Sequence, residues 1–258
     1  MATANISPSQ DAIITGPGFQ TVFANARNAG TGTTLFVNPS DGTHAQWQQS
    51  GAGTGTVVGS QLKTNSYTFF GSTLFSIQRC FYDFSFSGLP ANSTITALNF
   101  KLFGESGIYT NDLGVPVLLK GTFDSSLATA DYDSIDGWSS GTGTPTAYSS
   151  VPAMSAGNWD ESDYNTMALN ATAVSDANSA YTAGERLKIV VMEHELDYSN
   201  SAPAGNADFR DVAWFSTTDS EENRPYLEVT YTVAAPEGNG IITLTSGKVT
   251  LSSGKLTL

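Results

Sequence analysis

The stretch Asn223-Arg-Pro-Tyr-Leu-Glu-Val-Thr-Tyr231 decides the fold of this 258-residue chain. Pro225 and the residue before it disfavour a helix, because a residue that precedes proline is biased toward extended backbone. From Leu227 onward every second side chain is apolar or aromatic, which is the alternation of a strand with one face against a core. The two faces are Leu227, Val229 and Tyr231 on one side and Tyr226, Glu228 and Thr230 on the other.

A second stretch predicts two strands joined by a turn: Arg79-Cys-Phe-Tyr-Asp-Phe-Ser-Phe-Ser-Gly-Leu-Pro-Ala-Asn-Ser-Thr-Ile-Thr-Ala-Leu-Asn-Phe-Lys-Leu102. Aromatic residues fill the first strand, which is expected over 74–86. The chain then turns at Ser87-Gly-Leu-Pro90 and returns over 94–103. We expect this pair of strands to form the centre of a β-sandwich.

Aromatic side chains lie on both faces of this first strand. Phe81 alternates away from Phe84 and Phe86, so the strand should be covered on both faces. Cys80 lies inside the same strand and is the only cysteine of the chain, which excludes an intrachain disulfide. Because no histidine stands near it in the sequence, we expect Cys80 to be a buried, inert thiol.

The two stretches together resemble the DNRLRE-type, or disaggregatase-related, domain. The resemblance rests on the Arg-Pro-aromatic-Leu ending at 224–227, on segment 79–102, and on Trp214-Phe-Ser-Thr217 just before the ending. It covers roughly residues 10–233 and implies an all-β, antiparallel jelly-roll β-sandwich similar to carbohydrate-binding modules. Domains of this kind are adhesion or sugar-binding modules of secreted and surface proteins, and similar ones occur in phage virion proteins.

The composition agrees with an all-β chain that has one main domain. It holds 25 glycines and only 14% charged residues, and alternating aromatic and β-branched runs recur between turn residues. A chain of this length can bury a sizeable core within one domain. We expect four parts: an N-terminal arm over 1–9, the sandwich over 10–233, a linker over 234–240, and a repeat tail over 241–258.

Further elements are expected between these landmarks. Additional strands are predicted at 11–15, 19–23, 33–37, 56–63, 66–70, 115–123, 186–192 and 212–216. Short helices are predicted at 158–164 and at 171–181, the second capped by Thr172 or Ser175.

The tail contains an internal repeat with a period of seven residues. Ile242-Thr-Leu-Thr-Ser-Gly-Lys248 matches Val249-Thr-Leu-Ser-Ser-Gly-Lys255, and Leu256-Thr-Leu258 begins a third copy. Strands this short bury too little surface to be stable alone, so we expect the tail to self-associate, as a trimer for instance, or to bind neighbouring virion proteins. A disordered tail is the alternative. The expected assembly residues share one apolar face: Ile242, Leu244, Val249, Leu251, Leu256 and Leu258.

The charge pattern excludes several classes of partner. The chain has a formal charge of −13 and no cluster of Lys and Arg, whereas nucleic-acid binding depends on neutralising phosphates. We therefore expect no nucleic-acid partner and no binding to an anionic membrane surface. No apolar run reaches the roughly 18–20 residues of a membrane span, so we expect no membrane insertion.

The N-terminal residues Met1-Ala-Thr-Ala-Asn-Ile-Ser-Pro8 have neither the basic start nor the apolar stretch of a secretory signal peptide. Two interpretations stay open. Either a signal was removed and the protein is extracellular, or the protein is made in the host cytoplasm and leaves as part of a virion. The second, a virion location, is the expectation that we carry forward.

The sequence lacks the usual catalytic patterns. His44 and His194 show no zinc-binding spacing, and no nucleophile elbow or phosphate-binding loop occurs. The cluster Glu193-His194-Glu195 is predicted to be a solvated strand end. The chain is therefore not expected to be an enzyme.

Paired carboxylates for glycoside hydrolysis nevertheless stay open as an alternative. Asp160, Glu161 and Asp163 follow Trp159 closely, and two carboxylates beside an aromatic ring are what such hydrolysis uses.

Two kinds of binding site are predicted. Asp131, Asp133 and Asp136 stand in a tight turn before Gly137, and oxygen ligands so spaced suit a structural Ca²⁺, although the spacing departs from an EF-hand loop by one position. No other cofactor is expected. Aromatic residues in loops are the candidates for contact with a host-surface glycan. They are Trp47, Tyr109, Trp138, Tyr148 and Trp159.

Three functions compete on these grounds. The first is a non-enzymatic structural protein of a phage virion, as a component of the head, the collar, a tail fibre or the decoration, whose carbohydrate-binding-like sandwich contacts host-surface glycan. The second is a carbohydrate-binding module of a secreted or cell-surface bacterial protein. The third is a polysaccharide depolymerase. We favour the first, and the oligomeric state of the chain would best separate it from the second.

Overall fold

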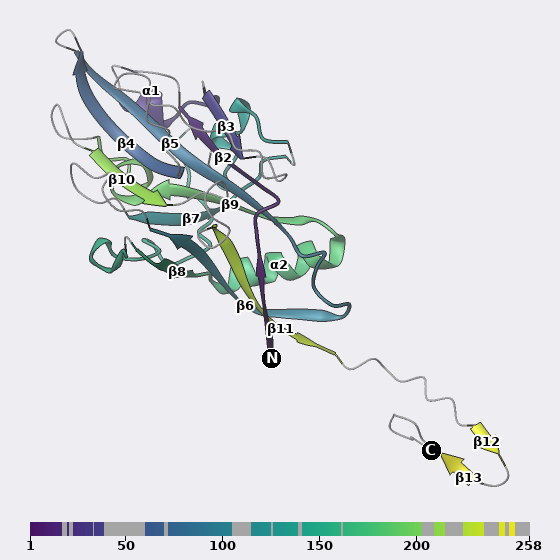
Figure 1. Ribbon diagram of the computed structural model, residues 1–258. Helices are drawn as coiled ribbons and strands as arrows, with labels where there is room; N and C mark the ends of the chain where they lie inside the picture. Colours follow the sequence, from purple (N-terminus) through teal and green to yellow (C-terminus); the bar gives the residue numbers. More distant parts are fainter. Residues whose placement is uncertain are drawn as a thin grey trace.

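The computed structural model describes residues 1–16, 20, 23–32, 34–38, 60–69, 72–104, 115–124, 126–138, 141–160, 162–202, 209–214, 224–234, 243–245 and 248–250. Within these residues the chain is mostly strands in two antiparallel sheets, with few helices (Figure 1). The expected all-β class is confirmed. The two sheets share one core, which gives a sandwich-like architecture.

The smaller sheet has four strands. In spatial order they are β1 (Ala2–Ile6), β11 (Tyr226–Val233), β6 (Ser93–Phe103) and β8 (Tyr164–Ala168). Strand β1 falls in the segment that we expected to be an N-terminal arm, and it pairs with β11 from Ala2–Tyr231 to Ile6–Leu227. The start of the chain therefore forms an edge of this sheet.

The larger sheet has seven strands. They are β10 (Phe209–Trp214), β4 (Ser60–Phe69), β5 (Ser72–Ser85), β2 (Gln10–Thr15) and β3 (Thr34–Asn38) in order, with β9 (Arg186–Glu193) beside β5 and β7 (Pro116–Lys120) beside β9. The long strand β5 branches this sheet. It pairs with β2 along one side, and along the other it pairs first with β4 over 72–78 and then with β9 over 80–85. The separate strands predicted at 56–63 and 66–70 are one strand, β4.

Strands β5 and β6 do not form a hairpin. The two strands and the turn between them lie where the sequence predicts, but β5 belongs to the larger sheet and β6 to the smaller one. The turn carries the chain across the core. Their aromatic residues meet across the core in edge-to-face geometry, with the ring centroid of Phe100 5.1 Å from that of Tyr82 and 5.8 Å from that of Phe84. Such pairs stabilise the contact between the sheets beyond the area that they bury.

Both faces of β5 are buried, as the alternation predicts. Tyr82, Phe84 and Phe86 belong to the core between the two sheets, together with Cys80, whose burial is confirmed. Phe81 points the other way into a second core, where its ring lies 5.6 Å from that of Phe123. The larger sheet therefore lies between two apolar layers.

One helix packs against each of the two apolar cores. Of the strand predicted at 19–23 the structure describes two residues: Gln20, which forms an antiparallel bridge with Phe75, and Phe23, which begins α1 (Phe23–Arg27). Helix α1 buries Phe23 and Ala26 against the second core. Helix α2 (Ala171–Ala183) is confirmed and buries three alanines in the first core. Its cap is not Thr172 or Ser175. The side chain of Asn170 accepts the Ala173 N–H at 3.1 Å.

Three short helical turns complete the description. They are η1 (Thr129–Asp133), η2 (Ala156–Asn158) and η3 (His194–Tyr198). The helix predicted at 158–164 is wrong, since η2 ends at Asn158 and β8 begins at Tyr164.

Two strands of the tail, β12 (Thr243–Thr245) and β13 (Lys248–Thr250), pair as a sheet of their own. No helix among the described residues is long and apolar enough to cross a membrane.

Candidate functional site

The outward side chains of the four-stranded sheet form the candidate site. Along β11, Leu227 and Val229 are buried between the sheets, whereas Tyr226, Glu228 and Thr230 are half-buried on the other side. Alternate side chains of a strand point to opposite faces of its sheet. Leu227 and Val229 thus face the core, and Tyr226, Glu228 and Thr230 face outward.

The register of the strands adds residues of β6 and β8 to the same face. Side chains that stand directly opposite each other in antiparallel strands share a face and interact. The paired positions are Tyr226–Lys101, Glu228–Asn99, Lys101–Thr166 and Phe103–Tyr164. We call these seven residues the outer face.

One part of the outer face is a row of polar side chains across three strands. Asn99 Nδ2 donates to Glu228 Oε1 at 2.9 Å, and Lys101 Nζ donates to Thr166 Oγ1 at 2.8 Å. Lys101 Nζ also lies 4.0 Å from Glu228 Oε2. These side chains hold one another in place and keep hydrogen-bonding capacity toward solvent, because a carboxylate accepts up to about four hydrogen bonds and an ammonium donates three.

The other part of the outer face is a group of three aromatic rings. The ring of Tyr164 lies 5.2 Å from that of Phe103 and 5.0 Å from that of Tyr226, both in edge-to-face geometry. All three side chains are half-buried, so each keeps part of its surface in solvent. The Tyr164 hydroxyl donates to the main-chain oxygen of Arg224 at 2.9 Å, which ties β8 to the start of β11.

The surroundings of the rings are negatively charged. Burial, the neighbouring Tyr226 and the carboxylate of Asp163 raise the pKa of Tyr164 to about 12. The pKa of Tyr226 is also raised, by burial first and then by Glu228 and Asp163. Both phenols therefore stay neutral at physiological pH and act as hydrogen-bonding groups.

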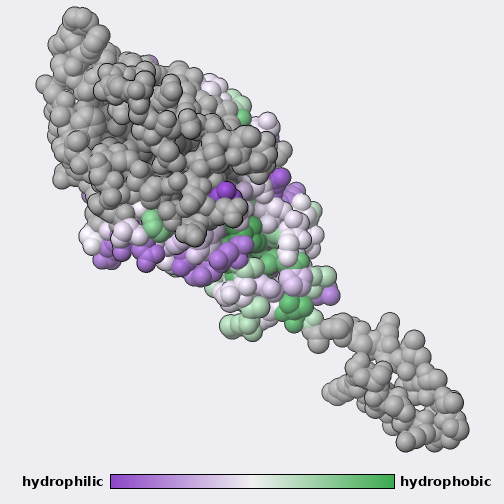
Figure 2. All heavy atoms as spheres, viewed as in Figure 1, coloured by the Kyte–Doolittle hydropathy of each residue, from purple (hydrophilic) through white to green (hydrophobic). Residues whose placement is uncertain are grey.

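This arrangement suits the binding of a polar molecule with apolar patches. Aromatic rings supply apolar contact, and fixed amide, hydroxyl and carboxylate groups beside them supply orientation. Hydrophilic and hydrophobic residues lie side by side over the part of the surface where β1, β6 and β11 run (Figure 2). A sugar ring has this double character, since its hydroxyls are polar and its C–H faces are apolar.

A polar cleft beside α2 is the main alternative among the described residues. It has a volume of about 680 Å³ and lies between α2 and the ends of β7 and β9. Two cations of its walls form ion pairs, Lys120 with Asp176 at 2.8 Å and Arg186 with the buried Asp83 at 2.7 Å. Its aromatic residue, Tyr148, is buried. The cleft therefore offers no ring surface, and we prefer the outer face as the site.

The loop aromatics predicted to contact glycan are not brought together. Trp47 and Tyr109 lie outside the described residues. Tyr148 is only 2% exposed, and its hydroxyl donates to Asp176 at 2.7 Å. Trp159 is half-buried and packs against the core between the sheets.

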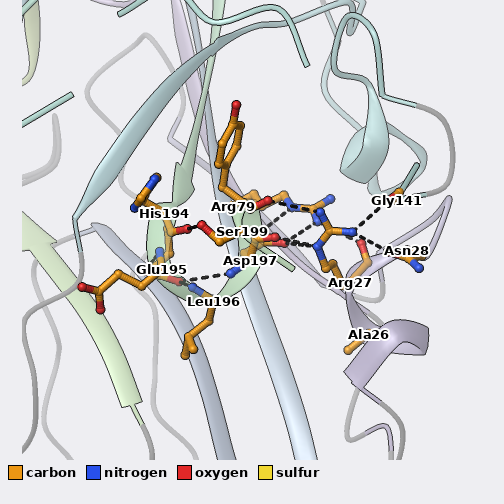
Figure 3. A network of polar contacts seen from close by, with 12 residues as sticks. Ala26, Arg27, Asn28, Arg79, Gly141, His194, Glu195, Leu196, Asp197 and Ser199 are labelled. Carbon is orange, nitrogen blue, oxygen red and sulfur yellow. Dashed lines mark hydrogen bonds and ion pairs between the residues drawn. The ribbon is translucent and has the colours of Figure 1, made fainter. Parts of the chain in front are cut away.

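Trp138, the remaining predicted ring, is part of a buried network of charges. The guanidinium of Arg27 lies 4.4 Å from the centre of its ring and that of Arg79 lies 5.1 Å from it. Both arginines bind Asp197, which lies in η3 (Figure 3). Arginine stacks well on aromatic faces. The Trp138 ring is therefore buried against the two guanidinium groups and has little surface left for contact with a ligand.

The three aspartates predicted to bind calcium lie in and after η1 with local partners. Asp131 accepts the Ala128 N–H at 2.8 Å and the Ser134 hydroxyl at 3.1 Å. Asp136 accepts the Thr146 hydroxyl at 2.5 Å. Burial raises the pKa of Asp133, which disfavours its charged form. No group of three His, Cys, Asp or Glu side chains that could hold a metal ion occurs among the described residues.

The strand end at Glu193 differs from its predicted, solvated state. Glu193 is fully buried and caps η3, because its carboxylate accepts the main-chain N–H groups of the next turn at 2.5, 2.7 and 3.1 Å. Burial raises the pKa of Glu193 to about 7 despite these hydrogen bonds. Glu195 is exposed as predicted, and the ring of His194 stacks on that of Tyr198 at 5.7 Å.

The acidic residues near Trp159 form a structured loop before β8. Asp160 and Asp163 are exposed, and Glu161 lies outside the described residues. The amide of the buried Asn165 holds this loop by bonding the main-chain N–H and oxygen of Asp160, both at 2.8 Å. Hydrogen bonds from Ser162 lower the pKa of Asp160. A carboxyl group so stabilised as the anion is a poor general acid.

Part of the expected assembly face lies in the tail hairpin. Leu244 of β12 stands opposite Val249 of β13. The other expected assembly residues lie outside the described part of the chain. They are Ile242, Leu251, Leu256 and Leu258.

Known proteins give no further assignment. A scan against protein-family models finds no match, and a search of curated proteins finds no significant relative. The functional argument therefore rests on the residues of the chain itself.

Proposed function

We propose that the chain is a non-enzymatic structural protein of a phage virion, a component of the head, the collar, a tail fibre or the decoration, and that its outer face contacts glycan on the host surface. The proposal includes the DNRLRE-type jelly-roll class, which the two sequence stretches resemble. It gives the sandwich the binding role and the repeat tail the assembly role.

The outer face is the observation that carries the glycan part. It places three half-buried rings beside a fixed row of polar side chains on one solvent-facing sheet. The phenols of Tyr164 and Tyr226 stay neutral at physiological pH and can hydrogen-bond to sugar hydroxyls. Each sugar contact of this kind is weak alone, and repetition in an assembly would raise the avidity by about 10²–10⁴.

The tail supports the virion part. Its seven-residue repeat forms a short hairpin in a sheet of its own, β12 with β13, and a two-stranded hairpin is marginal in water without further partners. Assembly with other copies or with neighbouring virion proteins would supply those partners. A carbohydrate-binding module of a secreted protein would use the same outer face, and sedimentation of the purified chain separates the two: a large assembly supports a virion component, and a stable monomer supports a single module.

A glycan array tests the proposal. The full chain, in its assembled form, should bind one or more bacterial surface glycans, and Tyr226→Ala should weaken that binding about tenfold or more, because it removes one ring of the group. Tyr198→Ala is the matched control, since Tyr198 is half-buried on η3 and lies outside the outer face. Binding to no glycan, or equal losses for both variants, would reject the proposal.

The depolymerase alternative has its own readout. Release of reducing ends from a polysaccharide, lost in Asp160→Asn or Glu161→Gln, would assign the chain to that class instead.

A further inference from the structure

Two carboxylates flank the aromatic rings of the outer face. Asp163 directly precedes Tyr164, and its Oδ1 accepts the Tyr164 N–H at 2.6 Å, which fixes the carboxylate at the start of β8. Glu228 follows Tyr226 by two residues on the same face of β11 and is held by Asn99. The rings therefore have two fixed negative charges near them, one just before β8 and one on β11.

The one cation of the outer face is already engaged. Lys101 is the one Lys or Arg of the outer face, and its ammonium is bound to Thr166 and placed near Glu228. The main-chain oxygen of Arg224, just before β11, accepts the Tyr164 hydroxyl. The charges that shift the phenols are carboxylates, Asp163 on both rings and Glu228 on Tyr226. With the net charge of −13, this makes the potential over the rings negative.

We infer that the outer face selects neutral glycans, built of hexoses or N-acetylhexosamines, and rejects glycans that carry carboxylates, sulfates or phosphates. The inference rests on the proposed function and adds the class of ligand. An acidic sugar on the rings would bring its charge close to Asp163 and Glu228, while Lys101, the one Lys or Arg of the outer face, is already bound to Thr166. A neutral sugar would instead donate hydroxyls to these same carboxylates, which are strong acceptors.

Titration with defined oligosaccharides tests the selection. The probes are hexamers of glucose and of N-acetylglucosamine as neutral ligands, and hexagalacturonate and a sialylated oligosaccharide as acidic ligands. The full assembled chain should bind a neutral probe at least tenfold more tightly than either acidic probe at low salt. High salt should reduce this difference in affinity between the neutral and acidic probes, because it screens exposed charges.

A variant that removes the negative charge of Asp163 tests whether that charge causes the selection. Asp163→Asn should raise the affinity for the acidic probes several-fold, because it removes a negative charge, and lower the affinity for the neutral probe, because it removes a charged acceptor for sugar hydroxyls. Asp124→Asn removes the same charge from an exposed position outside the outer face and should change neither affinity. An acidic probe that binds as well as the neutral ones, or an Asp163→Asn effect no larger than that of Asp124→Asn, would overturn the inference and leave glycan binding standing. Binding of none of the four probes and of no array glycan would overturn both.

Discussion

Arg79 holds Asp197 by two parallel hydrogen bonds, from Nε to Oδ2 at 2.8 Å and from Nη2 to Oδ1 at 2.9 Å, and both side chains are fully buried. Burial works against the charge of Arg79, but Asp197, Tyr132 and Asp133 together outweigh it and raise the pKa of Arg79 above its ordinary value. The remaining donors of Arg79 reach main-chain oxygens of Arg27 and Tyr132. This pair therefore joins α1, β5, η1 and η3.

Breaking this buried pair should cost far more stability than breaking an exposed one. Asp197→Ala leaves the Arg79 charge buried without its partner, and we expect a loss of about 3–5 kcal/mol in the free energy of unfolding. Lys120→Gln removes a partly exposed ion pair and should cost about 1 kcal/mol or less. Urea titration measures both. Similar losses for the two variants would show that the Arg79 network does not stabilise the fold.

The core between the sheets should depend on the aromatic residues of β5 that point into it. Phe84 is fully buried against Phe100 of the opposite sheet. Phe84→Ala should therefore lower the free energy of unfolding by about 3–5 kcal/mol, through lost burial and the cavity left behind. Denaturant titration checks this value, and a change near zero would mean that Phe84 does not pack in the core.

Glu193 should make stability depend on pH in the mildly acidic range. Its pKa is about 7 in the folded chain and 4.5 as an ordinary value, so the folded state binds the proton more tightly. Stability from this group is then fully present below pH 4.5 and is lost as the pH rises through 7, by roughly 3 kcal/mol in total. Unfolding measured between pH 4.5 and 8 should show this decline.

Two variants test whether Glu193 causes this loss of stability with rising pH. Glu193→Gln should flatten it, because glutamine does not titrate, and Glu195→Gln, at the exposed neighbouring position, should leave it unchanged. A decline of the same size in the Glu193→Gln variant would assign the effect to other groups.

The tail should be needed for assembly and not for the sandwich. Deletion of 235–258 removes the β12–β13 hairpin and leaves every strand of the two main sheets. We expect the truncated chain to keep its circular dichroism spectrum and its cooperative unfolding, and to sediment as a monomer. Normal assembly of the truncated chain would contradict the assembly role of the repeat.

Strand patterns predicted most of the fold, because alternation reports burial directly. The two faces of β11 and the double burial of β5 follow from the period of the side chains alone. The turn between β5 and β6 was predicted, but alternation does not tell a hairpin from a crossover between sheets. The turn allows both, and contacts between residues distant in the sequence, such as Phe84 with Phe100, decide between them.

The candidate site was harder to predict than the fold. Glycan contact was predicted for aromatic residues in loops, but Trp138 and Tyr148 are buried and contact residues that are distant in the sequence. The rings of the outer face stand on strands instead. Tyr226 was recognised as outward-facing, whereas Tyr164 was missed because residues 158–164 were predicted to be helical. Only the register of β6 with its two neighbours brings the rings together.

Chemical-shift mapping tests the central claim, glycan contact by the outer face, most directly. The labelled full chain is titrated with the glycan that binds best on the array, and the perturbed signals are assigned. We predict that the largest shifts occur at Lys101, Tyr164 and Tyr226, with little change around Trp159 or along the cleft beside α2. Shifts confined to those other regions, or none at saturating glycan, would contradict the claim.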